Sequence, residues 1–451
     1  MDTRLAELSR TIDPAELGRR IRVARVAAGM TQVQVAGEDI TAAYLSRIED
    51  GQRRPEALLL GRLAVRMGTT LEELLIGVSH DERAELQLGL DHAELALAGG
   101  DAPQALTRAE QLLARLERTA DTELVRRARR IRASALEMTG DLDGAIMAFE
   151  DLVGEPIADA VWLKDLISLS RCYRDGGEPA RAIEVGDRAR ALIVELGLEG
   201  LTEAIQLSVT VAAAYHVRGD LGEAMRVCKR ALAEAEKYDS PIGKASAYWN
   251  ASLIDAATHG ATPQSLDLAR KALALFELGD DNRNLAKLRG LVARLHLSTT
   301  PPEPQAALDI MAVAERELAV GGSAWDQALV HVNRGRALVL LGRLDEAVAS
   351  AERALAESPA KASLLDAWAH VVLGQAAALD ARPSDAREHY GRAIHALTAA
   401  GADREAAQLW FDLGTLLTDV GDTDGALQAF RNAGASTGLR VGESPTAHLR
   451  A

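Results

Sequence analysis

A turn pattern that returns about every forty residues constrains the fold of this chain more than any other feature. From residue 81 onward, a small or flexible residue is followed four to six positions later by a small residue, mostly alanine, and an aliphatic one. Successive small residues lie 40, 37, 42, 41, 42, 40, 39 and 40 positions apart. They are Ala105, Ala145, Ala182, Ala224, Ser265, Ala307, Ala347, Ala386 and Ala426, with weaker copies of the pattern at Ala182, Ser265, Ala307 and Ala386. The pattern predicts about nine helical hairpins, which stack into a solenoid because one hairpin cannot bury its apolar faces alone.

These hairpins resemble tetratricopeptide repeats. The resemblance rests on the small residue where the two helices cross, on a glycine in several first helices, and on a large first-helix residue. The glycines are Gly335, Gly374 and Gly414, and the large residues are Trp249 and Trp410. The family's unit has about 34 residues, so we expect helices longer by about one turn. HEAT-like helical pairs share the longer period and remain an alternative subtype. The resemblance implies a right-handed α-solenoid.

A different pattern runs from Met30 to Pro55 and predicts two short helices joined by a tight turn. Thr31 is a candidate N-cap for the first helix, and Gly37 ends it. Thr41 caps the second helix, which places the apolar residues at 45 and 48 on one face. Apolar stripes on both sides of this segment predict three more short helices, so that about 65 residues form a five-helix core.

The N-terminal segment resembles the lambda-repressor-like helix-turn-helix domains of the Xre family. The matching elements are Arg25, the run Gly29-Met30-Thr31-Gln32, the run from Tyr44 to Gly51 with the letters YLSRIEDG, and Arg53-Arg54-Pro55. Any one of these would mean little, but their joint occurrence over about residues 14 to 77 favours DNA binding. We therefore predict an all-α protein with a five-helix DNA-binding domain ahead of the repeats.

The resemblance also implies roles for individual residues. Gln32 is expected to bond a phosphate, and Arg53 and Arg54 to lie along the DNA backbone. Arg25 and Glu49 are expected to form a structural ion pair. Base edges are expected to face the second helix of the motif at Thr41, Ala42, Ala43 and Arg47. Tyr44 and Ser46, on the outer faces of this helix, are further candidate DNA-binding residues. Because alanines offer only methyl contacts, Arg47 is the side chain there that can bond guanine at two acceptors.

The charge of the head predicts that it does not act alone. Residues 14–67 hold nine Arg, no Lys and six acidic residues, a net charge of +3. A single head would neutralise few phosphates and bind weakly. We therefore expect a homodimer on a palindromic operator in double-stranded DNA, with half-sites about 10 bp apart. Within the first 77 residues eleven Arg balance eleven acidic residues. The overall net charge of −15 therefore lies in the rest of the chain.

Alignment with the tetratricopeptide pattern assigns certain first-helix positions to the concave groove of the solenoid. Many of these positions carry cations, which favours an anionic ligand or a carboxylate-bearing peptide. Charges on solvated helix faces are common, so the collective bias is the better argument. The candidate groove residues are Arg127, Arg130, Lys164, Arg171, Arg174, Gln206, His216, Tyr248, Asn250, Arg289, His296, Arg336, Trp368 and Gln375. We expect Trp249 to serve packing, and Trp325, His331 and Asn333 to belong to core or surface.

A DNA-reading head followed by a long solenoid resembles regulators in which the repeats sense a ligand, including the quorum-sensing peptide receptors of Gram-positive bacteria. We expect a transcriptional regulator whose repeats bind a peptide or small anionic effector and control dimer geometry. The alternative is a promoter-tethered scaffold whose solenoid docks a protein partner. An enzyme is not expected, because the chain has no nucleophile elbow, P-loop, H-E-x-x-H or dinucleotide motif.

Other features limit cofactors and location. Cys172 and Cys228 are too few and too far apart for a disulfide framework or a metal cluster, so we expect small core residues, with no cofactor and no metal. A signal segment and an apolar run of membrane-spanning length are both missing from the sequence. We expect a cytoplasmic protein, nucleoid-associated when bound. The expected parts are an N-terminal extension (1–13), the DNA-binding domain (14–77), a polar joint (78–82), the solenoid (83–434) and a frayed tail (435–451).

Overall fold

The computed structural model describes residues 3–78, 80–117, 119, 121–154, 156–278, 282–318, 324–358, 363–400 and 404–436. All regular elements within these residues are helices, as the sequence predicts. The chain divides into two compact units, Met1–Glu155 and Pro156–Ala451, and each is described by itself. Across the described residues, none of the helices combines the length and the apolar character needed to span a bilayer.

The N-terminal head of the first unit contains the five predicted helices and one more before them. Their bounds are α1 Thr3–Thr11, α2 Pro14–Ala27, α3 Gln32–Ala36, α4 Ala42–Glu49, α5 Ala57–Arg66 and α6 Leu71–Ile76. Side chains from all six helices meet in one core, in which Leu17, Ile21, Leu45, Ile48 and Leu60 are fully buried. Helix α1 lies in the segment expected as an extension, and its Leu5 and Leu8 pack against this core.

Two helix pairs complete the first unit. They are α7 His80–Ala98 with α8 Ala102–Leu116, and α9 Thr122–Thr139 with α10 Leu142–Val153. The segment expected as a polar joint begins with the buried Val78, and its residues 80–82 belong to α7. Val78 shares a core cluster with Leu86 and Leu90 of α7, so the head continues into the first pair with little polar chain between them.

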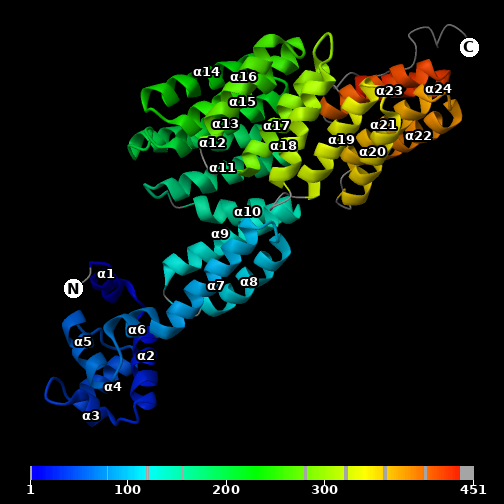
Figure 1. Ribbon diagram of the computed structural model, residues 1–451. Helices are drawn as coiled ribbons and strands as arrows, with labels where there is room; N and C mark the ends of the chain where they lie inside the picture. The colour runs from blue at the N-terminus through cyan, green and yellow to red at the C-terminus, as the bar shows by residue number, and fades with distance from the viewer. Residues whose placement is uncertain are drawn as a thin grey trace, which may run out of the picture. The chain divides into compact units, whose positions relative to one another are not determined.

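Seven further pairs make up the second unit, in which each pair stacks against the next (Figure 1). The first four pairs are α11 Ala160–Asp175 with α12 Pro179–Glu195, α13 Thr202–Arg218 with α14 Leu221–Lys237, α15 Pro241–His259 with α16 Pro263–Phe276, and α17 Asn282–Ser298 with α18 Pro304–Leu318. The last three are α19 Ala324–Leu340 with α20 Leu344–Glu357, α21 Ser363–Leu379 with α22 Pro383–Ala400, and α23 Arg404–Asp419 with α24 Thr423–Ser436. The expected tail extends past residue 436 and so falls mostly outside the described residues.

The small residues that define the sequence period occupy equivalent places in the structure. Each of the nine lies near the start of the second helix of a pair and is buried. Ala426 is 4% exposed, and the other eight are fully buried. At Ala182 and Ser265 a serine of the first helix donates to the carbonyl of the small residue, so the two helices approach closely and leave room for a small side chain only. The paired helices α7–α24 have 12 to 19 residues each, which accounts for the long repeat.

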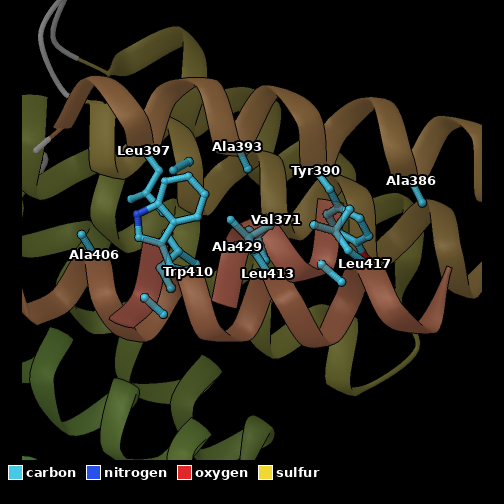
Figure 2. Close-up of a cluster of buried hydrophobic side chains, with 14 of the residues drawn as sticks. Val371, Ala386, Tyr390, Ala393, Leu397, Ala406, Trp410, Leu413, Leu417 and Ala429 are labelled. Carbon is cyan, nitrogen blue, oxygen red and sulfur yellow. The ribbon is translucent and has the colours of Figure 1, made fainter. Parts of the chain in front are cut away.

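Large side chains fill the space between successive pairs. Figure 2 shows this core for the last two pairs, where Tyr390 and Leu397 of α22 point toward Trp410 and Leu417 of α23. Tyr390 and Trp410 are 1% and 3% exposed. The expected packing role of Trp249 is confirmed, since its ring meets Phe276 edge to face with the ring centroids 6.1 Å apart. Cys172 and Cys228 are both buried, as expected of small core residues.

Candidate nucleic-acid interface and repeat surfaces

Local interactions define both ends of α3 and the start of α4. Thr31 and Gln34 form a capping box at the start of α3, and Gly37 ends this helix with a φ of 53°. The hydroxyl of Thr41 accepts a hydrogen bond of 3.1 Å from the Tyr44 backbone amide, which starts α4. Each cap satisfies an amide that the helix leaves without a partner. The turn is therefore defined by local chemistry at both ends.

Helix α4 is anchored on one face and exposed on the other. Leu45 and Ile48 are fully buried in the head core. Thr41, Ala43 and Arg47 are exposed, whereas Ala42, Tyr44 and Ser46 are half-buried. The Tyr44 ring packs against the head core, so part of this side chain is used internally. The candidate base-reading residues therefore share a surface whose most extended polar group is the guanidinium of Arg47.

A buried network joins α2, α3 and α4 behind this surface. Arg25 donates from Nε to Glu49 Oε1 at 2.6 Å and from Nη2 to Glu49 Oε2 at 3.0 Å. Its Nη1 donates to the carbonyl of Met30 at 3.0 Å. Gln32 Nε2 donates to Glu49 Oε2 at 2.9 Å, so part of the side chain expected on a phosphate is used inside the head. The ion pair that the resemblance implies is thus present and holds α4 against α2.

The carboxylate of Glu49 is kept charged by this network. Its side chain is 1% exposed, and burial alone would raise its pKa. Hydrogen bonds from Arg25 and Gln32, with the charge of Arg22, outweigh burial and lower the pKa of Glu49 below its usual value. Three neighbours thus stabilise one buried charge.

The two arginines after α4 differ in their surroundings. Both are exposed, and Arg53 is placed in keeping with a backbone contact. Arg54 instead donates from Nη1 to the carbonyls of Ser9, at 3.2 Å, and Arg10, and from Nη2 to the carbonyl of Ile12 at 2.6 Å. In this structure its guanidinium therefore binds the end of α1, a segment for which the sequence pattern assigned no role.

Arg66 also makes contacts within the head, and the sequence pattern did not predict them. Its Nη1 donates to the carbonyls of Val35, at 2.6 Å, and Ala36, at 3.0 Å. Its Nη2 donates to Asp39 in the following turn at 2.7 Å. The guanidinium satisfies the last carbonyls of α3 and holds the turn before α4. About thirty residues separate Arg66 from its partners, so helix periodicity contains no signal for this contact.

Most of the predicted groove cations have carboxylate neighbours. Arg127 binds Asp91 at 2.5 Å and Glu94 at 2.6 Å, both on the preceding first helix, α7. Arg289 binds Glu277 at 3.0 Å and Glu317 at 2.9 Å. Such pairs neutralise the charge that was expected to favour an anionic ligand.

The other positively charged candidates also lie beside polar groups. Lys164 Nζ is 3.6 Å from Glu203, and Arg174 Nε donates to Asp175 at 2.7 Å. Arg171 Nη2 donates to Ser168 Oγ at 3.3 Å, and Arg130 is half-buried.

His296 corrects the predicted groove. Its ring is buried, with Nδ1 2.6 Å from Glu303 Oε2 and Nε2 3.4 Å from Arg270. It therefore belongs to the packing of α16 and α17 rather than to a groove surface. The repeat pattern assigned His296 to the groove because the same face of a first helix borders both the groove and the loop that leads to the second helix.

The uncharged candidates are half-buried side chains on first helices. Asn250 Nδ2 donates to the carbonyl of Ser246 in its own helix at 3.1 Å. Tyr248 packs against the core of its pair, and the ammonium of Lys271 lies 5.9 Å from its ring centroid. Gln206, His216 and Gln375 are also half-buried. His331 and Asn333 are buried, and Trp325 is exposed, in line with the core-or-surface expectation.

Side chains of different chemistry lie on the first helices of the last three pairs, α19, α21 and α23. The Arg336 guanidinium of α19 lies over the Trp368 ring of α21, 4.5 Å from its centroid. Asp412 of α23, which the sequence did not single out, lies near enough for Arg336 to act on its charge. Burial raises the pKa of Asp412, while a hydrogen bond from Gln408 and the charge of Arg336 oppose that rise. A cation thus lies over an aromatic face, and its charge also acts on a partly buried carboxylate of another first helix.

A separate pocket of about 540 Å³ lies between α20, α21 and α22. Its lining includes Asp366, His370, Glu388, Arg392 and His395. His370 and Trp368 are two positions apart on α21, so they point to nearly opposite sides of the helix. Among the described residues, no group of three or more His, Cys, Asp and Glu side chains is arranged to hold a metal ion.

Comparison with known proteins assigns both parts of the chain to domain families. Residues 16–75 match the model of a helix-turn-helix domain, and residues 90–160 and 312–362 match that of the tetratricopeptide repeat. No curated protein sequence matches the chain.

Several solved structures resemble it. A Rap protein complexed with Competence and Sporulation Factor is 12% identical with a TM-score of 0.52, and the match covers 79% of this chain and 98% of that one. PlcR of Bacillus thuringiensis, in complex with the peptide PapR7 and DNA, is 14% identical with a TM-score of 0.38, over 62% of this chain and 99% of PlcR. A signal transduction ATPase with a tetratricopeptide repeat sensor from Pyrococcus horikoshii is 15% identical with a TM-score of 0.47, over 96% of this chain and 63% of that one. The two domain models show that the chain carries an N-terminal helix-turn-helix domain followed by tetratricopeptide repeats.

Proposed function

We propose that the protein is a sequence-specific DNA-binding transcriptional regulator whose repeats bind an effector and control the pairing of two chains on an operator. The observation that carries this proposal is the division of α4 into a buried face, with Leu45 and Ile48, and an exposed face, with Thr41, Ala43 and Arg47. A helix anchored in this way can enter the major groove with its outer side chains against base edges.

Binding-site selection with the full chain, followed by affinity measurements on the selected duplex, tests this proposal. Arg47→Ala is expected to weaken specific binding by about tenfold and to relax the preference at one base pair. Arg129→Ala, which removes an exposed arginine from α9, is the matched control and should bind like the wild type. If the wild-type chain binds a random duplex as tightly as the selected one, the proposal is wrong.

The internal use of arginines in the head supports binding by a pair of chains. Arg25, Arg54 and Arg66 each make several hydrogen bonds within the head. At most six of the nine arginines of residues 14–67 are therefore left to neutralise phosphates, and affinity grows with that number. Two heads joined through their repeats would double the contacts and read a palindrome.

Light scattering on the free chain and on its operator complex measures this pairing. We expect two chains per operator and a footprint with two half-sites about one helical turn apart. One chain per operator, with a single half-site footprint, would contradict pairing and leave DNA binding itself in place.

The cluster of Arg336, Trp368 and Asp412 is our proposed effector site. A peptide offers the mixed groups that a cation, an aromatic face and a carboxylate can bind together, whereas the pairing of other groove cations argues against a purely anionic ligand. A Rap protein of the same repeat fold was solved with Competence and Sporulation Factor, which is a further reason to seek the effector on the repeats.

Selection of short peptides of random sequence on the immobilised full chain tests this site. Trp368→Ala and Arg336→Gln should lose the selected peptides, whereas Arg353→Gln, a change at an exposed arginine of α20, should keep them. Peptides that bind all three variants equally would place the effector elsewhere.

The exposed aromatic side chains of the last pair favour a second candidate function, a scaffold that docks a protein partner. Phe411 and Phe430 are 53% and 37% exposed, with their ring centroids 5.3 Å apart. Apolar groups gathered at a surface are typical of protein contacts. Two results together would favour the scaffold. One is a protein partner that binds the wild type but not Phe411→Ser, and the other is a melting temperature of the chain that no peptide raises.

A further inference from the structure

The hydrogen bonds of Arg54 mark the end of α1 as an anchored contact. Its guanidinium reaches the carbonyls of Ser9, Arg10 and Ile12, which lie in the last turn of α1 and just beyond it. The last carbonyls of a helix lack partners within the helix, and they carry partial negative charge. Arg54 supplies both the missing donors and a compensating positive charge. This arginine thus holds α1 in place.

The apolar side of α1 faces two cores within the first unit. Leu5 packs against the head core. Leu8 packs against that core and also against the cluster that contains Val78 of the connection and Leu86 and Leu90 of α7. Helix α1 therefore forms a second bridge between the head and the first repeat pairs, in addition to the covalent connection through α6.

This bridge ends beside the helix that faces DNA. Arg54 lies in the segment directly after α4, and Gly51 in the same segment packs closely against the start of α2. A Cβ atom on Gly51 would lie 2.7 Å from the Cα of Ala15, so the two backbones lie close together there. Arg54 therefore links α1 directly to the segment that continues α4.

We propose that α1 is the positioning element that fixes the head on α7–α10, with Arg54 as its anchor and Leu8 as its contact with the repeats. The regulatory consequence rests on the proposed function: a change in the repeats reaches α4 through α1 as well as through α6. Arg54 is then a positioning residue and not a contact of the DNA backbone.

Distance measurements between spin labels in the full chain test the bridge without DNA or effector. Val26→Cys on α2 and Met147→Cys on α10 provide exposed label sites in the same unit, while both native cysteines are buried. Leu8→Ala is expected to broaden the distance distribution. Leu5→Ala removes the same side chain from the same helix but touches the head core alone, so it should leave the distribution close to that of the wild type.

The outcome for Leu8→Ala decides the proposal. A distribution as narrow as that of the wild type, in a protein with unchanged helix content, would overturn it, because α6 alone would then hold the head. A broadened distribution in both leucine variants would also overturn it, since α1 would then act only by stabilising the head. Neither result depends on whether the chain binds DNA.

Operator affinity as a function of salt separates the two roles of Arg54. Arg54→Gln should broaden the label distances and leave the slope of log affinity against log salt unchanged. Arg53→Gln is the matched control and should reduce the magnitude of that slope by the amount that corresponds to about one phosphate contact. An equal reduction with Arg54→Gln would overturn its assignment as an anchor. Failure of the wild type to bind any selected duplex would refute the proposed function. The spin-label distances would then still test whether α1 bridges the head and the first repeats.

Discussion

Arg25 and Glu49 join α2 to α4 by two hydrogen bonds, of 2.6 and 3.0 Å, within the head. Glu49 is 1% exposed, and Arg25 is 13% exposed. Removing one partner of a buried pair leaves the other charge without compensation. We therefore expect Glu49→Gln to lower the free energy of unfolding of the head by about 3 kcal/mol. Urea unfolding followed by circular dichroism measures the change, and Glu56→Gln at an exposed N-cap that makes no capping bond is the control. A change below that of the control would show that the pair does not stabilise α4.

Gly374 and Gly391 lie on the two helices of one pair. We expect substitution by alanine to change the stability of the protein in opposite directions at these two positions. A Cβ atom on Gly374 would lie 2.3 Å from Cε1 of the buried Tyr390, whereas one on Gly391 meets no atom within 4 Å. Gly374→Ala should destabilise the protein by about 1–3 kcal/mol through overpacking. Gly391→Ala should stabilise it by up to about 1 kcal/mol, because alanine favours the helix. Thermal unfolding of both variants compares them, and an equal shift of the two would contradict the packing argument.

The stacked rings of His370 and His389 predict a dependence of stability on pH. Their Nδ1 atoms are 3.4 Å apart. Burial is the main cause that lowers both pKa values, aided by the charge of Arg392 and, for His370, by the neighbouring imidazole. The unfolded chain binds more protons than the folded one below about pH 6.5, so the free energy of unfolding should fall as the pH drops through that value.

Unfolding in urea across this pH range checks the histidine prediction. His370→Asn combined with His389→Gln should flatten the pH dependence, whereas the exposed His259→Gln should not. The result would be contrary to expectation if the wild type gained stability on acidification between about pH 7 and 5.5.

The two cysteines predict inert thiols in the folded protein. Burial raises the pKa of Cys228 to about 12, and Cys172 is fully buried. Reaction requires an accessible thiolate, so iodoacetamide should modify neither residue at neutral pH until the chain unfolds. Mass spectrometry of native and urea-treated protein measures the extent of labelling. Rapid modification of either thiol in the native chain would contradict its burial.

The helix pairs were predictable from the sequence because the signal and the cause are local. Ala145, Ala224 and Ala347 recur at the period of the fold, and each lies where two helices of one pair cross. Burial of one helix face selects small and apolar residues at helical spacing, so the pattern records which face is inside. The caps at Thr31 and Thr41 were predictable for the same reason, since an N-cap bonds an amide only three residues away.

The partners of long charged side chains were not predictable from the sequence. Arg127 was assigned to a groove, yet its guanidinium binds Asp91 and Glu94 of a neighbouring first helix. Arg54 was assigned to DNA, and the sequence held no sign that its guanidinium binds the end of α1. Helical periodicity places the Cα atom of such a residue on a face, but several rotatable bonds let the charged group reach across to another helix. The choice among partners depends on distances between helices that are far apart along the chain.

The sequence by itself therefore determined the all-helical class, the helix-turn-helix segment and the nine pairs, because each follows from contacts within or between neighbouring helices. Only the tertiary structure decided which cations remain exposed, that α1 bridges the head core and the first repeats, and that Arg336 lies over the ring of Trp368. Those relationships depend on packing between distant segments, where a residue's identity alone does not specify its neighbour.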